Sequence, residues 1–452
     1  MNLNFRPSSP RSIAASLLET AVAGCLLGLA GTPHCAATVS DEDFNALKSM
    51  LQQMNQDLQA LKKIHALDQQ EIQVLKQERG GAPSSAINAD ASAIATAPAA
   101  PKALHNFAMV GDAEVQYAKT FGSPDSSGNP SHGGFLLADF APIFLYQANQ
   151  KILFEAGFDI MLQNGSTGTH ASGSSTSVNL SFGQLDFLCN DYLTLVSGYM
   201  LLPLGTYSER GAGWLNKIPD DPLGHEFLPG AGAGVQLRGA FAVGESGEAV
   251  TYSIYGVNGP SSVDNTAMAG SLDLGGNVGL NSDGSTGNLH SAPSGGGRVG
   301  WFLPWGAHKD LELGVSGQTG VWDDAGDHYW SAGVLDAALH LGPSFELKGE
   351  FINTWTETSD FGTLHPWAAW TQAGYKLAGL GLDVPLLNDI EVVGRYDTEN
   401  DGQGTKTDRV TTGLVYYLTN TLLLEGDYEF IQSTGPKALP PNFLVFQISY
   451  GF

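Results

Sequence analysis

The sequence predicts an all-β transmembrane barrel of about 16 antiparallel strands, preceded by an N-terminal α-helical coiled coil. Three observations support this prediction. From about residue 104 onward, apolar and polar residues alternate with the period of a strand that has one apolar face. Short connections alternate with long ones along the same region. The chain ends on 442-NFLVFQISYGF-452, in which every second residue is apolar. Such a strand would promote aggregation in water unless its apolar face contacts lipid.

The composition limits the possible functions. The chain has 452 residues and a formal net charge of -25, so nucleic acid and anionic lipid surfaces are poor partners. No internal stretch reaches the roughly 18 apolar residues that a spanning helix needs. A membrane protein of this composition must cross the bilayer as a closed barrel, because only closure pairs all of its backbone polar groups.

Residues 1–37 have the pattern of a signal peptide. Arg6 and Arg11 precede an apolar run over residues 13–30, and 35-CAA-37 supplies small residues for cleavage. This pattern predicts export from the cytoplasm.

The cysteines leave one alternative open. The stretch 22-VAGC-25 resembles a lipoprotein box, in which Cys25 would carry the lipid. Cleavage after residue 37 would instead leave Cys189 as the sole cysteine, which excludes an intrachain disulfide.

Residues 38–79 have a heptad pattern, which predicts a coiled coil. The two seam positions are occupied by Phe44, Leu51, Leu58, His65 and Ile72, and by Leu47, Met54, Leu61, Asp68 and Leu75. An amphipathic helix that folds back on its own domain is the alternative. Residues 80–103 are rich in Ala, Ser and Pro and are typical of a linker.

Residues 104–452 contain sixteen alternating segments. Short connections near 147–150, 189–191 and 244–247 are separated by long loops rich in Gly, Ser and Asp. An even strand number places both termini on the side of the short turns, which is the periplasmic side of an outer-membrane barrel. Aromatic residues near strand ends are predicted to form girdles at the lipid interfaces: Trp305, Trp322, Trp330, Trp367, Tyr450 and Phe452.

The closing segment resembles the last strand of bacterial outer-membrane porins, which ends in Phe with apolar residues at alternate positions. Signal, coiled coil, linker and barrel together resemble the trimeric sugar- and dicarboxylate-type porins, and 203-PLGTYSERGAGWLNKIPDDP-222 resembles segments of phosphate-selective-type porins. The resemblance implies a homotrimer in the bacterial outer membrane, with the coiled coil in the periplasm. The implied partners are lipid and lipopolysaccharide, the barrel assembly machinery, and small hydrophilic solutes that diffuse passively. Anions are one candidate class of solute, and the acidic composition leaves the ion preference open.

The polar face of the strands is predicted to line an aqueous lumen, because sixteen strands are wide enough for a channel and charges need water. The inward basic residues include Lys151 near a turn and a predicted basic strip of Arg238, Arg298, Lys348, Lys376, Arg395 and Arg409. The inward acidic residues include Glu155, Asp159, Asp186, Glu312, Glu346, Glu350, Glu391, Asp397, Glu425, Asp427 and Glu429.

The third long loop, about Leu204 to Leu228, is expected to fold inward as the constriction, as it commonly does in porins. Its charged residues are Glu209, Arg210, Lys217, Asp220, Asp221 and Glu226. Counting eight strands round the barrel, the loop should face the strands that carry Lys348, Lys376, Arg395 and Arg409. A transverse field across the pore is one interpretation. Interleaved ion pairs along the wall are the other.

No catalytic residue, cofactor or metal site is expected. The stretch 295-GGGRVG-300 matches G-x-G-x-x-G but leads into a strand, so no helix is available to hold a phosphate. Asp336, His340 and Ser344 suggest a hydrolase, yet no nucleophile motif accompanies them. The histidines lack metal-ligand spacing. The alternative function, from a different class, is a structural tether whose coiled coil binds peptidoglycan or a periplasmic partner.

Overall fold

A computed structural model describes residues 106–121, 133–167, 171–207, 215–244, 247–263, 267–275, 293–382, 384–437, 439 and 442–452, with only the backbone of 163–167 and 171–175. The predicted signal peptide (1–37), coiled coil (38–79) and linker (80–103) lie outside the described residues. Among the residues that are described, no helix is both long enough and apolar enough to cross a bilayer.

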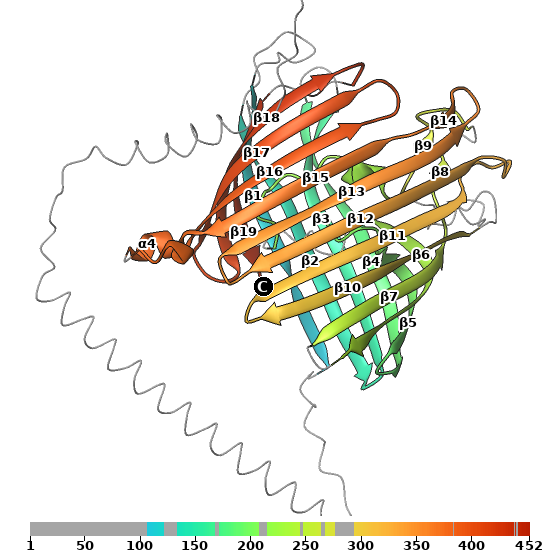
Figure 1. Ribbon diagram of the computed structural model, residues 1–452. Helices are drawn as coiled ribbons and strands as arrows, with labels where there is room; N and C mark the ends of the chain where they lie inside the picture. Colours follow the sequence, from blue (N-terminus) through green and yellow to red (C-terminus); the bar gives the residue numbers. More distant parts are fainter. Residues whose placement is uncertain are drawn as a thin grey trace, which may run out of the picture. The chain divides into compact units, whose positions relative to one another are not determined.

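The described chain forms a closed antiparallel barrel of sixteen strands, which confirms the predicted fold and strand number (Figure 1). The strands of the wall are β1 (Phe107–Phe121), β2 (Gly134–Asn149), β3 (Ile152–Thr167), β4 (Ala171–Asn190), β5 (Leu193–Leu201), β6 (Ala231–Val243), β7 (Glu248–Val257), β10 (Ser294–Gly306), β11 (Lys309–Val321), β12 (Tyr329–Leu341), β13 (Phe345–Thr358), β15 (Trp367–Lys376), β16 (Ile390–Asn400), β17 (Lys406–Tyr417), β18 (Leu422–Thr434) and β19 (Asn442–Gly451).

Short elements decorate the connections. β8 (Ser261–Ser262) and β9 (Leu272–Asp273) pair with each other, and β14 (Gly362–Leu364) extends the hairpin of β13. The helical turns are η1 (His225–Phe227), η2 (Leu377–Leu380) and α4 (Pro385–Asn388).

The last strand closes the barrel against the first, as the sequence predicts. β19 pairs antiparallel with β1, in a register that runs from Asp112 opposite Gly451 to Phe121 opposite Asn442. Reciprocal backbone hydrogen bonds between Gly111 and Phe452, at 3.0 and 2.9 Å, finish the ladder. Both ends of the described chain therefore lie at the same rim of the barrel.

The connections alternate in length, as predicted. At the rim of the termini, short turns include 150–151, 191–192 and 307–308, while the longest connection there, 377–389, contains η2 and α4. The opposite rim carries long connections such as 202–230 and 258–293. This asymmetry is typical of outer-membrane barrels.

Alternation gives the wall two faces. Phe446, Ile448 and Tyr450 are exposed on the outside, whereas Gln447 and Ser449 between them are buried on the inside. Because side chains of a strand alternate strictly, the same apolar exterior and polar interior recur on β16, β17 and β18. The prediction of the inward parity is correct for these strands.

Two of the predicted girdle aromatics are not at the lipid surface. Trp322 is 0% exposed and Trp330 is 1% exposed, and both pack inside the barrel against the long loops. The prediction for them was wrong because closeness to a strand end does not determine which face a side chain occupies. Trp305 and Tyr450 are exposed, as girdle residues should be.

We expect replacement of Phe452 to weaken the closure of the barrel. Its ring stacks on Phe140 at 5.9 Å and lies 6.2 Å from Tyr450. Because this ring is only partly buried, Phe452→Ala should destabilise the barrel by about 1–2 kcal/mol, and Phe452→Asp by more. The measurement is the fraction of heat-modifiable, trypsin-resistant barrel after expression, with Asp191→Asn in the exposed 191–192 turn as the control. Normal yields of folded Phe452→Asp barrel would contradict the role of this terminus.

Candidate functional site

The loop between β5 and β6 (202–230) folds into the barrel and docks against one side of its wall. Its two ends are held together where the backbone N–H of Leu202 donates to the carbonyl of Gly230 at 3.0 Å. Its contacts reach side chains on strands from β10 to β18, which are remote in sequence from β5. We refer to this segment as the docked loop.

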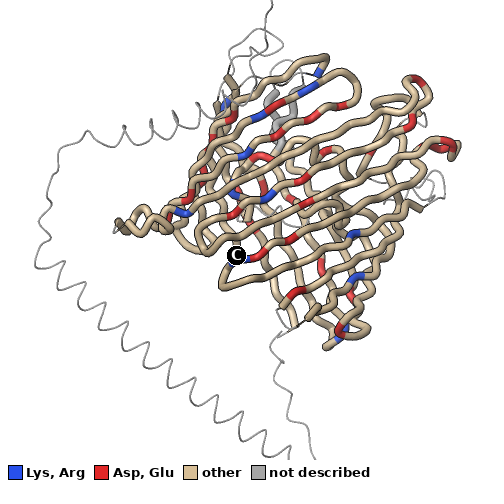
Figure 2. The backbone as a smooth tube through the Cα atoms, viewed as in Figure 1, with Lys and Arg blue, Asp and Glu red and all other residues tan. Residues whose placement is uncertain are grey.

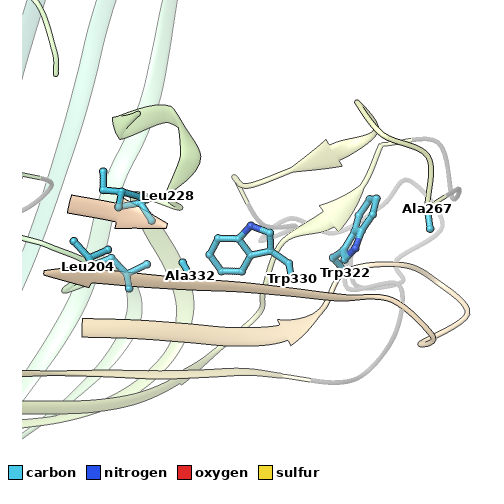
Figure 3. Close-up of a cluster of buried hydrophobic side chains, with 8 residues drawn as sticks. Leu204, Leu228, Ala267, Trp322, Trp330 and Ala332 are labelled. Carbon is cyan, nitrogen blue, oxygen red and sulfur yellow. The ribbon is translucent and has the colours of Figure 1, made fainter. Parts of the chain in front are cut away.

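An apolar cluster fixes the outer part of the docked loop (Figure 3). Leu204 and Leu228 of the loop pack with Trp322 and Trp330, whose side chains are fully buried. Ala332, Val334 and Ile352 of the wall complete the contact. Burial of several such side chains contributes roughly 1.5–3 kcal/mol each, so this cluster is a strong local anchor.

Glu350 on β13 binds the first turn of the docked loop. Its Oε1 accepts hydrogen bonds from the backbone N–H of Tyr207 at 3.0 Å and from the hydroxyl of Thr206 at 2.9 Å, and also from the Thr206 N–H. Gly205 adopts a φ of 70°, and a Cβ there would lie 2.7 Å from Glu350 Oε1. The turn can therefore approach the carboxylate this closely only with glycine at this position.

Arg298 on β10 binds the same turn from the other side. Its Nη1 donates to the carbonyl of Gly205 at 3.1 Å, and its guanidinium forms a two-pronged ion pair with Asp336 on β12. The N–H of Gly205 donates to the hydroxyl of Ser316 on β11 at 2.9 Å. Two neighbouring strands, β10 and β11, thus hold one loop residue through both of its backbone polar groups, and Asp336 on β12 positions the arginine.

Lys217 and Ile218 attach the middle of the docked loop. The Lys217 ammonium pairs with Glu346 at 2.9 Å and with Glu391 at 2.7 Å, while Ile218 is fully buried in an apolar cluster. That cluster consists of Ile218, Val393, Val415 and Leu423. Burial lowers the pKa of Lys217, but attraction to the two glutamates outweighs this effect and the net pKa is raised. The lysine therefore stays charged in its ion pairs.

Two arginines receive the tip of the docked loop. Arg395 donates to the carbonyls of Asp220 at 2.7 Å and Asp221 at 3.1 Å. Arg409 pairs with the Asp220 carboxylate and also donates to the Asp221 carbonyl. Both guanidiniums donate to one carboxylate, Asp397, at 3.0 and 3.2 Å. The strands β16 and β17 thus present two buried cations that are neutralised by the loop and by their own wall.

Inside the docked loop, Tyr207 is the central hydrogen-bonding group. Its hydroxyl donates to Asp221 at 2.6 Å and accepts from Asn216 at 2.7 Å. Burial raises the pKa of the Tyr207 phenol well above its usual range, and the adjacent Asp221 carboxylate raises it further. The phenol therefore remains a neutral donor, and it connects the first turn of the docked loop to Asn216 and Asp221 in its second half.

The structure brings only some of the predicted site residues together. Lys217, Asp220 and Asp221 contact the wall as described, whereas Glu226 is exposed on η1. Glu209 and Arg210 lie outside the described residues.

Of the predicted basic strip, Arg395 and Arg409 touch the tip of the docked loop and Arg298 touches its first turn. Lys348 pairs with Glu346, and Arg238 pairs with Asp186 on the far wall. Figure 2 shows charges of both signs on the strands that Figure 1 labels β16 to β18.

Lys376 lies over the Tyr417 ring, 4.6 Å from its centroid, and is the register partner of Glu391, which binds Lys217 of the docked loop. Lys151 differs from the expectation, because it lies exposed in the turn between β2 and β3 and not on the wall. Alternation predicts the face of a strand residue but not the residue at which the strand begins.

Several residues of the site were not singled out from the sequence. Glu350, Asp397 and Tyr207 hold the docked loop, and the first two were expected only as members of the inward acidic face. Their parity was visible in the sequence. The loop residues that Glu350 and Asp397 bind lie 143 to 174 residues away along the chain, and no local pattern could have identified them.

The hydrolase interpretation finds no support in the geometry. Asp336 is occupied by Arg298, and His340 Nδ1 lies 2.7 Å from Asp310 instead. In the part of the chain that the structure describes, no group of three His, Cys, Asp or Glu side chains could hold a metal ion.

Comparison with known proteins gives structural likeness only. No protein-family model and no curated protein matches the sequence. Among solved structures, OmpF of Salmonella typhi in complex with daunomycin matches with a TM-score of 0.50 and 12% identity, over 77% of this chain and 98% of that one. The anion-selective porin of Comamonas acidovorans matches with a TM-score of 0.48 and 13% identity, over 76% and 99% of the two chains. The outer-membrane channel DcaP of Acinetobacter baumannii matches with a TM-score of 0.48 and 11% identity, over 76% of this chain and 97% of that one.

At 12% identity, the similarity to OmpF indicates a shared fold only. The chain therefore has the sixteen-stranded barrel of an outer-membrane porin. The predicted resemblance to this class of barrel is confirmed at the level of architecture.

We expect Glu350→Ala to release the docked loop. Hydrogen bonds to a charged partner contribute about 1.5–3 kcal/mol each, so losing this acceptor should raise the opened fraction of the loop tenfold or more. The measurement is the rate of trypsin cleavage after Lys217 in the folded, detergent-solubilised barrel. The cleavage rate of Glu350→Gln, which keeps one acceptor, should lie between the rates of Glu350→Ala and the unaltered protein. The rate of Asp191→Asn should equal that of the unaltered protein. A cleavage rate of Glu350→Ala equal to that of the unaltered protein would contradict this assignment.

Proposed function

We propose that this protein is an outer-membrane channel through which small hydrophilic solutes diffuse passively. The observation that carries the proposal is the charge of the barrel interior. Inward charges remain accessible to solvent: the Arg238 side chain is 40% exposed, Asp221 is exposed, and Glu155 and Asp159 are half-buried. Charges of this kind are too costly in a dry interior, so the lumen must contain water.

The position of the docked loop supports a narrowed channel. The hydrogen bonds and ion pairs described above join the loop to strands from β10 to β17, on one side of the wall. Among the described residues, Glu155 and Asp159 on β3 form no hydrogen bond or ion pair with the docked loop, and Asp186 on β4 pairs with Arg238. A loop that is docked against one side of the wall narrows the lumen and leaves a path for solutes along the rest of the wall.

The N-terminal segments fit the same proposal. Residues 1–37 would direct export, the linker 80–103 would join two independent units, and the coiled coil 38–79 would stand in the periplasm and hold a homotrimer together. Lipid and lipopolysaccharide would surround the barrel, and the barrel assembly machinery would recognise the strand that ends at Phe452. The alternative of a structural tether requires no open lumen, and the accessible interior charges favour the channel over it.

The purified protein should form stepwise, voltage-independent conductance in planar bilayers, because a water-filled lumen carries ions without a conformational change. Heat-denatured protein at the same concentration is the control for contaminating channels. Correctly folded barrels that produce no conductance would favour the tether.

Deletion of residues 38–79 should leave a folded barrel but weaken its oligomer. The linker separates two units that pack independently, so heat modifiability should be unchanged. The temperature at which oligomers dissociate in detergent should fall, because the heptad seam is lost. A matched deletion of linker residues 84–99 is the control. An unchanged dissociation temperature in the 38–79 deletion would show that the coiled coil does not hold the oligomer.

A further inference from the structure

We propose that the channel selects small cations, by means of carboxylates on the tip of the docked loop and on the strands β1, β2 and β18. This inference rests on the proposed channel function and specifies which solutes the pore would prefer. It depends on an imbalance within the lumen: basic side chains are neutralised by partners in the protein, whereas a group of acidic side chains is not.

Most basic side chains of the described lumen are held in ion pairs. Arg238, 40% exposed, pairs with Asp186, and Lys348 pairs with Glu346, whereas Lys376 lies over the Tyr417 ring. Arg298 is held by Asp336, and Lys217 lies between two glutamates. Arg395 and Arg409 share Asp397, and Arg409 also pairs with Glu429 at 3.4 Å. Arg395 is 2% exposed and Arg409 is 3% exposed. These guanidiniums therefore offer little surface and little net charge to a passing anion.

An acidic pair lies on β1 and β2, which follow β18 and β19 round the closed barrel. Glu114 on β1 and Asp139 on β2 are direct partners in the antiparallel register. Like charges directly opposite each other in a sheet are destabilising. Neither residue forms a salt bridge with a described residue, and the Asp139 carboxylate also interacts electrostatically with Asp159 on β3. A mobile cation between Glu114 and Asp139 would relieve their repulsion.

The tip of the docked loop extends the same acidic surface. The charge of Asp221 interacts unfavourably with that of Glu114. Arg395 and Arg409 donate to the backbone carbonyl of Asp221 and not to its carboxylate. Its one described hydrogen bond comes from a neutral phenol, Tyr207, which leaves the negative charge uncompensated.

Asp427 on β18 gives an independent indication of a cation. The residue is only 4% exposed, and neither carboxylate oxygen has a hydrogen-bond partner among the described residues. It interacts unfavourably with Glu429 and Asp220, and the favourable effect of Arg395 and Arg409 is shared with the carboxylates that these arginines already bind. A buried carboxylate without a donor is costly. A cation at the loop tip would supply the missing partner.

The consequence for permeation follows from electrostatics. A narrow path lined by one sign of charge raises the local concentration of the opposite ion and excludes ions of the same sign. A transverse field would require accessible, unpaired bases facing the loop. Arg395 and Arg409 are buried in ion pairs, and Lys348 pairs with Glu346. A path lined by these carboxylates should prefer hydrated alkali cations and small organic amines over chloride and carboxylates.

The test is the reversal potential of the full-length channel in a potassium chloride gradient at low salt. The unaltered protein should favour potassium over chloride. The variants are Glu114→Gln, Asp139→Asn, Asp221→Asn and Asp427→Asn, singly and combined. Each lost carboxylate within roughly 6 Å of the path should lower the permeability ratio about threefold. Asp191→Asn, in an exposed turn outside the lumen, is the matched control and should leave the ratio unchanged.

Two further arms keep the result interpretable. In molar salt the effect should vanish, because screening shortens to about 3 Å. An Asp221→Cys channel, already folded and conducting, should lose its cation preference when a positively charged thiol reagent is added. Preference for chloride in the unaltered channel, or an unchanged ratio in the combined variant, would overturn the inference while leaving the channel function intact. Absence of any conductance would instead overturn the channel function, and the inference with it.

Discussion

Hydrogen bonding between β19 and β1 closes the sheet, and the other features of the structure depend on that closure. Lipid offers no partners for backbone polar groups, so a strand edge in the bilayer must be paired. Once the ring is closed, strict alternation sends every second side chain outward, as Phe446 and Ile448 show. The remaining side chains must share one interior. A slip of one residue in β16 would turn Arg395 and Asp397 towards lipid, which makes the register as important as the closure.

The interior is organised by charge more than by apolar packing. Two buried guanidiniums, Arg395 and Arg409, need acceptors, and the docked loop supplies backbone carbonyls together with one carboxylate. Glu350 has the complementary role, because it accepts the N–H groups of the first turn. Attractive pairs of this kind draw the loop to one side of the lumen. The side that remains carries acidic groups without such partners, so the position of the loop and the charge of the path have one physical origin.

The sequence predicted the periodic features correctly and could not predict the contacts between distant segments. Strand number, the pairing of first and last strands, and the inward parity of residues such as Glu391 follow from alternation, which is local. The burial of Trp322 and the position of Lys151 in a turn depend on where each strand ends and on how the loops pack inside the barrel. The pattern within a single strand contains neither piece of information. The prediction that the loop faces the strands carrying Lys348, Lys376, Arg395 and Arg409 came from counting strands. Whether the loop directly contacts the wall depends on how far the side chains on both extend, and counting strands does not predict this.

We infer that the docked loop lies against the β16–β18 side and that water fills the path along β1 and β2. The most direct measurement is the rate at which a small charged thiol reagent modifies single cysteines in the folded channel, in a background in which Cys189 is serine. Asp221→Cys and Glu114→Cys should react rapidly and change the current. Ile218→Cys and Val415→Cys, within the apolar cluster under the loop, should react at least tenfold more slowly, as expected for thiols kept from solvent. Equal rates at all four positions would show that the loop does not dock there.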